Sequence, residues 1–131
     1  MDKDELFLTI GTMIVSDPEI LAVEWDALSF VCSIDPGHRQ MTGYCYAGDE
    51  WEGAPLGDMV FGAMNPLQEL QDAMAAETGN RWKQALIHIT RPGPEIDIQF
   101  EYDDPRRWSL KKVSLDLADY AESLRPPGAN K

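Results

Sequence analysis

The segment Arg81–Trp108 constrains the fold most strongly, because its second half alternates without a break between apolar and polar side chains. A period of two residues is typical of a strand with one buried face. The apolar positions are Ile96, Ile98, Phe100 and Tyr102, and the polar ones are Asp97, Gln99, Glu101 and Asp103. The stretch Trp82–Thr90 is also β-rich, and Arg91-Pro92-Gly93-Pro94 breaks the two runs apart. We therefore predict a β-hairpin with one core face and one acidic face.

A hairpin alone is marginally stable in water, so its buried face needs further strands or a helix. Leu21–Ile34 and Gln40–Ala47 read as two more strands, joined by the turn Asp35-Pro36-Gly37-His38. They form a second predicted hairpin.

Three segments have a helical apolar period, from about residue 4 to 16, from Asn65 to about Thr78, and from about 114 to 124. Asn65-Pro66 is typical of a helix start, and Gly79 is placed to cap that helix at its end. Gly11 inside the first helix indicates either local weakness or a close approach by another backbone.

The order α-β-β-α-β-β-α predicts a single α+β domain over residues 1–131. We expect a mostly antiparallel sheet of about four strands, made of the two hairpins, with helices packed on one face. The other face can stay in water and would include the acidic side of the second hairpin.

The stretch from Gly48 to Met64 reads as irregular, because it is rich in glycine, and it carries the acidic run Asp49-Glu50-Trp51-Glu52. A tryptophan between carboxylates is either a lid folded onto the core or an exposed aromatic anchor for a partner. The lid is the favoured reading.

Charge is distributed unevenly along the chain. The formal net charge is −12, and residues 1–80 hold 15 acidic and 2 basic residues, whereas residues 81–131 hold 8 and 9. Such a field repels nucleic acid and anionic membranes, and it speeds the encounter with a basic partner. An equally weighted reading is that the acidity only keeps the protein in solution.

The N-terminal sequence has no signal-peptide pattern, and no apolar run approaches the length of a membrane span. We therefore expect a cytoplasmic protein. In that compartment Cys32 and Cys45 are expected to be reduced thiols in the core.

The sequence offers no complete catalytic constellation, so we expect no enzyme activity and no cofactor. Cys32 and Cys45 lie among apolar strand residues, where burial suppresses the thiolate. His38 and His88 lack a second ligand at zinc spacing, so we expect His88 to face solvent or to be hydrogen-bonded. No nucleotide-binding glycine motif is present.

One carboxylate cluster is dense enough to hold a hard cation such as Mg²⁺, namely Asp97, Glu101, Asp103 and Asp104. It lacks the spacing of an EF-hand. The favoured alternative is a solvated strand face followed by an aspartate-proline turn, with Arg106 and Arg107 as counter-charges.

Several short motifs follow one another in a fixed order along the chain: Met13-Ile14, Glu24-Trp25-Asp26, Tyr44-Cys45-Tyr46, Leu67 with Leu70, Trp82-Lys83, and the run Ile96-Asp97-Ile98-Gln99-Phe100-Glu101-Tyr102-Asp103-Asp104-Pro105. In these motifs and their order the chain resembles the YezG-like family of bacterial antitoxin or immunity proteins. The chain departs from the family in the Pro-Gly-Pro turn, in the glycine-rich 48–62 loop and in its proline-ended C-terminus.

The resemblance implies a non-enzymatic protein that binds and neutralises a cognate toxin, typically one with a nuclease domain. A nuclease carries a positive groove for phosphate, which an acidic surface could fill. Our hypothesis is that this surface consists of Asp97, Glu101, Asp103 and Asp104, together with Glu24 and Asp26, and that Trp51 is an aromatic anchor at its edge.

Two other functions stay open. One is a metal-assisted enzyme that uses the Asp103-Asp104 cluster, and the other is an acidic adaptor or subunit that binds a housekeeping protein. An exposed sheet edge would also permit a homodimer.

Overall fold

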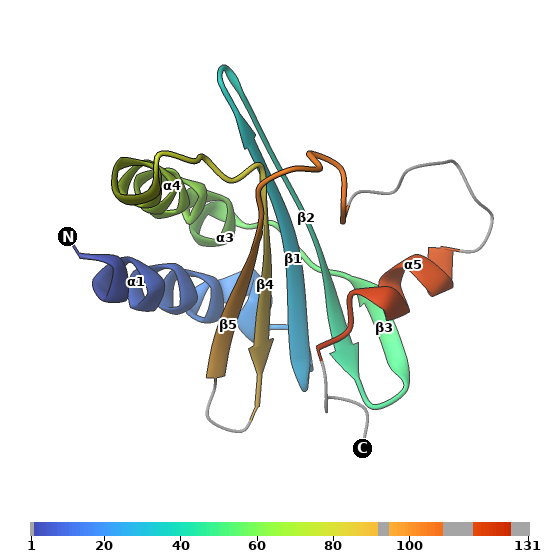
Figure 1. The fold of residues 1–131 in the computed structure, drawn as a ribbon. Coiled ribbons are helices and arrows are strands. Elements are labelled where there is room, and N and C mark those ends of the chain that lie inside the picture. The colour runs from blue at the N-terminus through green and yellow to red at the C-terminus, as the bar shows by residue number, and fades with distance from the viewer. Residues whose placement is uncertain (1, 92–94, 109–116, 127–131) are drawn as a thin grey trace.

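The computed structural model describes residues 2–91, 95–108 and 117–126. Within these ranges the chain forms one antiparallel sheet of five strands in the order β3-β2-β1-β4-β5 (Figure 1). The strands are β1 (Ala27–Asp35), β2 (His38–Ala47), β3 (Glu50–Gly53), β4 (Gln84–Thr90) and β5 (Glu95–Glu101). The helices are α1 (Lys3–Ser16), α2 (Pro18–Leu21), α3 (Asp58–Gly62), α4 (Met64–Thr78) and α5 (Leu117–Ser123). The α+β prediction is therefore confirmed.

Both predicted hairpins are present. β1 pairs with β2 across the Pro36-Gly37 turn, in which Gly37 has a φ of 78°, a value that glycine adopts without steric cost. β4 pairs with β5 in continuous antiparallel register. The turn predicted at Pro92-Gly93-Pro94 lies outside the described residues.

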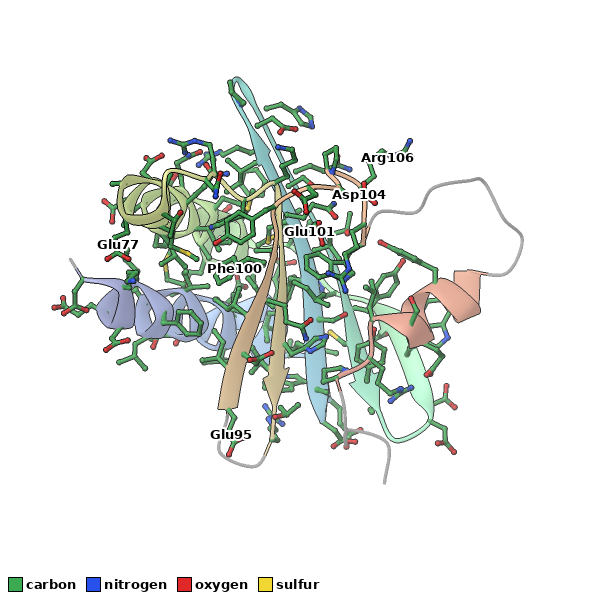
Figure 2. All side chains as sticks on the ribbon, in the orientation of Figure 1. Glu77, Glu95, Phe100, Glu101, Asp104 and Arg106 are labelled. Atoms are coloured by element: carbon green, nitrogen blue, oxygen red, sulfur yellow. The ribbon has the colours of Figure 1, made fainter. Side chains whose placement is uncertain are left out.

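The main core lies between the sheet and the helices α1 to α4. The alternating residues of β5 behave as predicted, since Ile96, Ile98 and Phe100 pack toward this core, and Figure 2 shows Phe100 on the helix side of its strand. The largest side chains that it buries completely are Trp25, Trp82, Phe30, Leu6, Ile10, Ile14, Ile20, Leu28, Met64, Leu67 and Leu70. Their burial supplies the hydrophobic driving force for this layer.

Gly11 marks a close contact between α1 and β5. A Cβ atom added at Gly11 would lie 3.0 Å from Cδ1 of Ile96. The sequence indicated either a locally weak helix or a close approach by another backbone, and the group that approaches is the Ile96 side chain. Glycine is used here because α1 lies directly on Ile96.

The last helix lies on the opposite face of the sheet from the others (Figure 1). Leu124 packs with Val31 and Leu86 in a second, smaller core, and the Tyr46 hydroxyl donates a hydrogen bond to the carbonyl of Ala121. Placing every helix on one face was therefore wrong, and so was leaving the second face free. α5 covers part of the second face because the apolar side of a helix must be buried against another element.

The segment from Gly48 to Met64 is more regular than its glycine content predicted. Glu50–Gly53 adds strand β3 beside β2, and Asp58–Gly62 forms α3. The predicted strand from Leu21 also starts later, because Pro18–Leu21 is the short helix α2. Five strands therefore replace the four that were expected.

The helix predicted from Asn65 to about Thr78 is confirmed to within one residue at its start, but the capping role of Asn65 is wrong. α4 begins at Met64, directly after α3, with Ala63 in the capping position. The Asn65 side chain instead accepts a hydrogen bond from Nη1 of Arg39. Gly79 ends the helix in the left-handed conformation, with φ of 78°.

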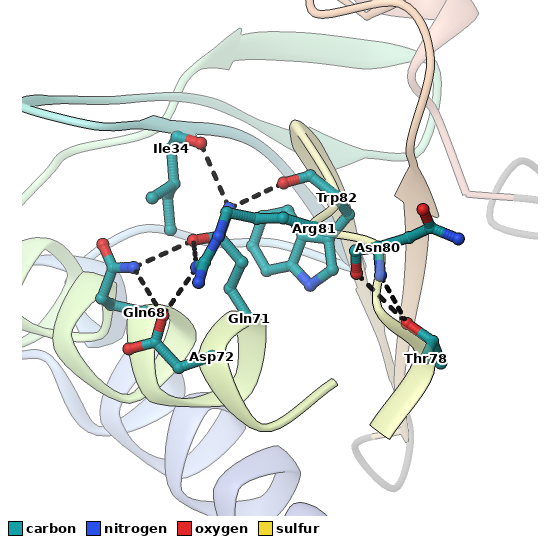
Figure 3. Close-up of polar contacts among 8 residues, drawn as sticks. All are labelled: Ile34, Gln68, Gln71, Asp72, Thr78, Asn80, Arg81 and Trp82. Carbon is teal, nitrogen blue, oxygen red and sulfur yellow. Dashed lines mark hydrogen bonds and ion pairs between the residues drawn. The ribbon is translucent and has the colours of Figure 1, made fainter. Parts of the chain in front are cut away.

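Gln71 joins α4 to the ends of two strands (Figure 3). Its buried amide nitrogen donates to the carbonyl oxygens of Ile34, at 3.2 Å, and of Trp82, at 2.7 Å. Its amide oxygen accepts from Nη1 of Arg81 and from Nε2 of Gln68, both at 2.9 Å. These hydrogen bonds offset the cost of removing the Gln71 amide from water, and they fix α4 relative to the strands.

Candidate functional site

The structure distributes the seven predicted partner-binding residues between the two edge strands and the start of the central strand. Asp97 and Glu101 lie on β5, with Asp103 and Asp104 just after it, whereas Trp51 lies on β3 and Glu24 and Asp26 precede β1. β3 and β5 are the two edge strands, so they stand about 19 Å apart at the usual strand spacing. The seven residues therefore do not form one continuous acidic surface.

Glu101 is engaged within its own loop. Its carboxylate accepts hydrogen bonds from the backbone N–H groups of Asp103, at 3.0 Å, and Asp104, at 3.1 Å. Nη1 of Arg107 lies 2.8 Å from the other oxygen. The backbone N–H of Asp104, the Arg107 guanidinium and the backbone N–H of Asp103 lower the pKa of Glu101 to about 2. This carboxylate therefore organises the loop after β5.

Asp104 is held in the same loop, where its carboxylate accepts the backbone N–H of Arg106 at 2.9 Å. Figure 2 shows Glu101, Asp104 and Arg106 together at one end of β5, with Glu95 at the other end. The aspartate-proline turn with arginine counter-charges matches the favoured alternative to a cation site. Asp103 and Asp97 are exposed.

Asp97 and Glu101 share the second face of β5, as the alternation predicted. Asp97 lies opposite His88 of β4. The part of the chain that the structure describes offers it no ion pair with lysine or arginine. Of the predicted binding residues, Asp97 and Glu101 lie on β5 itself. Glu101 is bonded within its own loop, so the Asp97 carboxylate is the one on the strand that remains available to a partner.

At the other edge, three carboxylates gather around β3. Glu24, Glu50 and Glu52 line a shallow depression of about 290 Å³ together with Cys45, Ala47 and Trp51. None of the three forms an ion pair with a described lysine or arginine. Asp26, in contrast, accepts the backbone N–H of Gly48 at 2.7 Å and so fixes the turn between β2 and β3. The β3 edge therefore presents a local negative charge that the described residues do not neutralise.

Trp51 is part of strand β3, so the favoured lid reading is wrong. Its indole ring meets the Tyr44 ring edge-on at a centroid distance of 5.5 Å, and Tyr44 meets Tyr120 of α5 at 5.9 Å. These aromatic contacts hold Trp51 half-buried at the rim of the acidic depression.

Sequence reasoning missed two further hollows. One is a polar groove of about 440 Å³ on the second face, whose lining includes Asp35, His38, Tyr44, Arg106 and Tyr120. It arises from the unexpected position of α5 and has no signal in the sequence. The other is an apolar groove of about 280 Å³ between α1 and β5. The sequence could have indicated this groove through Leu8, an apolar residue that lies outside the buried stripe of α1.

The two cysteines and His88 are buried, and burial shifts the pKa of each toward its neutral form. Cys32 and Cys45 are free and buried, as predicted. Burial raises the pKa of Cys32, and burial with the nearby Glu52 charge raises the pKa of Cys45 to about 11. His88 is hydrogen-bonded to the Leu124 carbonyl at 2.9 Å, and its burial lowers its pKa despite that bond and the Asp97 charge.

The described residues contain no group of three or more His, Cys, Asp and Glu side chains placed to hold a metal ion. Among the same residues, no helix has the length and apolar character needed to cross a bilayer.

No known family model matches this chain, and no curated protein matches its sequence. The resemblance to the YezG-like family therefore stays a prediction.

Proposed function

We propose that this chain is a non-enzymatic antitoxin or immunity protein, which acts in the cytoplasm by binding and neutralising a basic toxin of the nuclease type. The observation that carries the proposal is the set of exposed carboxylates at the sheet edges that lack counter-charges among the described residues. They are Glu24, Glu50 and Glu52 at β3 and Asp97 at β5. The resemblance to the YezG-like family supports the choice of toxin as the partner.

Ion pairs neutralise some acidic residues of the described chain, but none of the four edge carboxylates. Asp72 is paired with Arg81, Glu77 with Lys3, and Glu122 with Arg125. A row of unneutralised carboxylates costs stability through mutual repulsion. The same row raises the rate at which a positively charged protein is captured and favours its bound orientation.

The mechanism is competition with phosphate. A nuclease must present lysine and arginine side chains to the nucleic-acid backbone. Carboxylates on a rigid strand can pair with those side chains in charge-assisted hydrogen bonds, so that substrate no longer binds. The chain then needs no chemistry of its own.

The test is a pull-down from lysate of the native host with tagged protein, at low and at high salt. We expect a basic toxin domain to be retained at low salt and released at high salt, because screening weakens the pairing of exposed charges. Recovery of a housekeeping complex would favour the adaptor function instead. Recovery of no basic protein would contradict the proposal.

Charge reversal then locates the contribution of the β3 edge. We expect the triple variant Glu24→Lys, Glu50→Lys and Glu52→Lys to lose most of the retained toxin. A matched control with the same net charge reverses Glu5, Glu19 and Glu69, which are exposed on three different helices. If both triples lose the toxin equally, the effect is one of net charge, and the β3 edge has no special role.

A further inference from the structure

β5 ends the sheet on the side opposite β3, and no described strand pairs with its outer edge. The outer edge of a strand carries backbone N–H and C=O groups that can form a ladder with an added strand. Proteins use such edges to bind extended segments of their partners. The side chains that flank this edge determine what kind of segment would fit.

On the helix side of β5, the edge is flanked by the apolar groove. Leu8, Gly11, Thr12 and Val15 of α1 form one wall, and Ile89 and Ile96 form the other, with Glu95 at the rim. Leu8 is 67% exposed, so its side chain is accessible to a ligand in the groove. The groove's volume of about 280 Å³ is large enough for an aliphatic side chain.

On the other side of β5, the edge is flanked by polar residues. Asp97 and Gln99 are both exposed there, and Asp97 has no ion pair within the described part of the chain. A strand added beside β5 would send its side chains alternately to the two faces. One set would enter the α1 groove, and the other set would lie next to Asp97.

We propose that the outer edge of β5, together with the α1 groove, binds an extended segment of the partner in which apolar residues alternate with lysine or arginine. This docking surface rests on the proposed function, and it specifies which part of a basic partner is recognised. The apolar residues fill the groove of Leu8, Val15 and Ile96. The basic residues pair with Asp97, and the backbones form the ladder.

A second copy of the chain fits the same edge poorly. Antiparallel self-pairing centred on Ile98 would bring Glu95 of one copy opposite Glu101 of the other, twice in each dimer. Like charges directly opposite each other destabilise a strand pair. The net charge of −12 on each copy adds to this repulsion.

The first test uses a synthetic peptide of about nine residues, the length of a long strand, in which valine alternates with lysine. We expect it to bind and to shift the amide NMR signals of β5 and of the Leu8 to Val15 segment. A peptide of the same composition with its valines in one block should bind about tenfold more weakly or not at all. The same should hold for a peptide with N-methylated backbone positions, which cannot form the ladder. Equal binding by all three peptides would overturn the proposal.

The second test uses variants of the full chain. Leu8→Asp removes the apolar wall at an exposed position, and Asp97→Lys repels the basic residues, so each should weaken binding of the alternating peptide about tenfold or more. Leu21→Asp is the matched control, because Leu21 is 63% exposed on α2, outside the groove. Unchanged binding by both test variants would refute the docking surface. So would concentration-dependent dimerisation in sedimentation that Leu8→Asp abolishes.

The two proposals can fail separately. If the pull-down retains a basic toxin equally with wild type, Leu8→Asp and Asp97→Lys, the function stands and the β5 site is wrong. If no basic protein is retained but the alternating peptide binds wild type and not Leu8→Asp, the β5 site stands and the toxin-neutralising function is wrong.

Discussion

Asp17 is a buried carboxylate that joins three helices. It is 1% exposed, and its oxygens accept the backbone N–H groups of Glu19, at 2.8 Å, and of Met59 and Val60, both at 3.0 Å. Burial alone would raise the pKa of Asp17, but these N–H groups at the starts of α2 and α3 lower it below its usual value. One side chain thus satisfies donors of two helices.

We predict that Asp17→Ala lowers the free energy of unfolding by about 3 kcal/mol, because it removes two caps and leaves buried N–H groups unpaired. Because the folded pKa is lowered, the stabilisation is fully present above the unfolded value and is lost as the pH falls through the folded value. Urea unfolding between neutral and acidic pH measures both effects. Asp2→Ala, which removes the exposed cap of α1, should cost about 1 kcal/mol. Equal costs for the two variants would contradict this account.

Position 43 on β2 accommodates only glycine, because the Phe30 ring of β1 packs directly against it. A Cβ atom added there would lie 2.4 Å from the Phe30 ring and 3.0 Å from the Ser29 carbonyl oxygen. We predict that Gly43→Ala destabilises the fold by about 1–3 kcal/mol, because Phe30 is fully buried and has no room to move. Gly53→Ala is the control, since nothing lies within 4 Å of a Cβ atom at that position. Thermal unfolding should separate the two variants clearly.

The sequence could predict which face of a strand each residue joins, but not which partner it meets. The alternation of β5 placed Ile98 and Asp97 correctly, because period two follows from the pleat itself. Glu101 belonged to the predicted binding surface, yet it organises the loop of Asp103 and Asp104. Such a local role depends on the path of the chain after the strand, which no periodicity encodes.

The sequence also could not predict on which face of the sheet α5 packs. The apolar spacing of Tyr120, Ala121 and Leu124 correctly indicated a buried stripe. A stripe shows which side of a helix is buried, but it does not show which face of the sheet covers it. The face is decided by partners far away in the sequence. Tyr46 binds the Ala121 carbonyl of the helix, and His88 binds the carbonyl of Leu124 just after it.

We predict that Tyr46→Phe loosens α5 without unfolding the main core. The Tyr46 hydroxyl bonds both the Ala121 carbonyl and the Ser29 hydroxyl in a buried setting, so its loss should cost about 1–2 kcal/mol. Amide hydrogen exchange should rise in α5 and stay unchanged in α4, which packs on the other face. Tyr44→Phe, on the same strand, controls for the loss of a phenol hydroxyl as such. Uniform acceleration throughout the chain would show that α5 is not a separate layer.

At the scale of the whole molecule, the net charge of −12 opposes the compact state. The repulsion should be strongest where carboxylates lie close together without counter-charges, as Glu24, Glu50 and Glu52 do at the β3 edge. Ion pairs at Asp72 and Glu77 relieve it elsewhere. The acidic edge is therefore expected to cost stability, a cost that binding of a basic partner would remove.

We predict that the double variant Glu50→Gln and Glu52→Gln melts at a higher temperature than wild type in low salt, because it removes unneutralised repulsion. The difference should shrink as salt rises from about 20 mM to about 500 mM, since the screening length falls several-fold. The matched control, Asp72→Gln with Glu77→Gln, removes the same charge but breaks two ion pairs, so it should gain less or nothing. Equal gains by both doubles would mean that only net charge matters. A selective gain at β3, combined with loss of toxin capture by the reversed edge, would show that these carboxylates serve binding rather than folding.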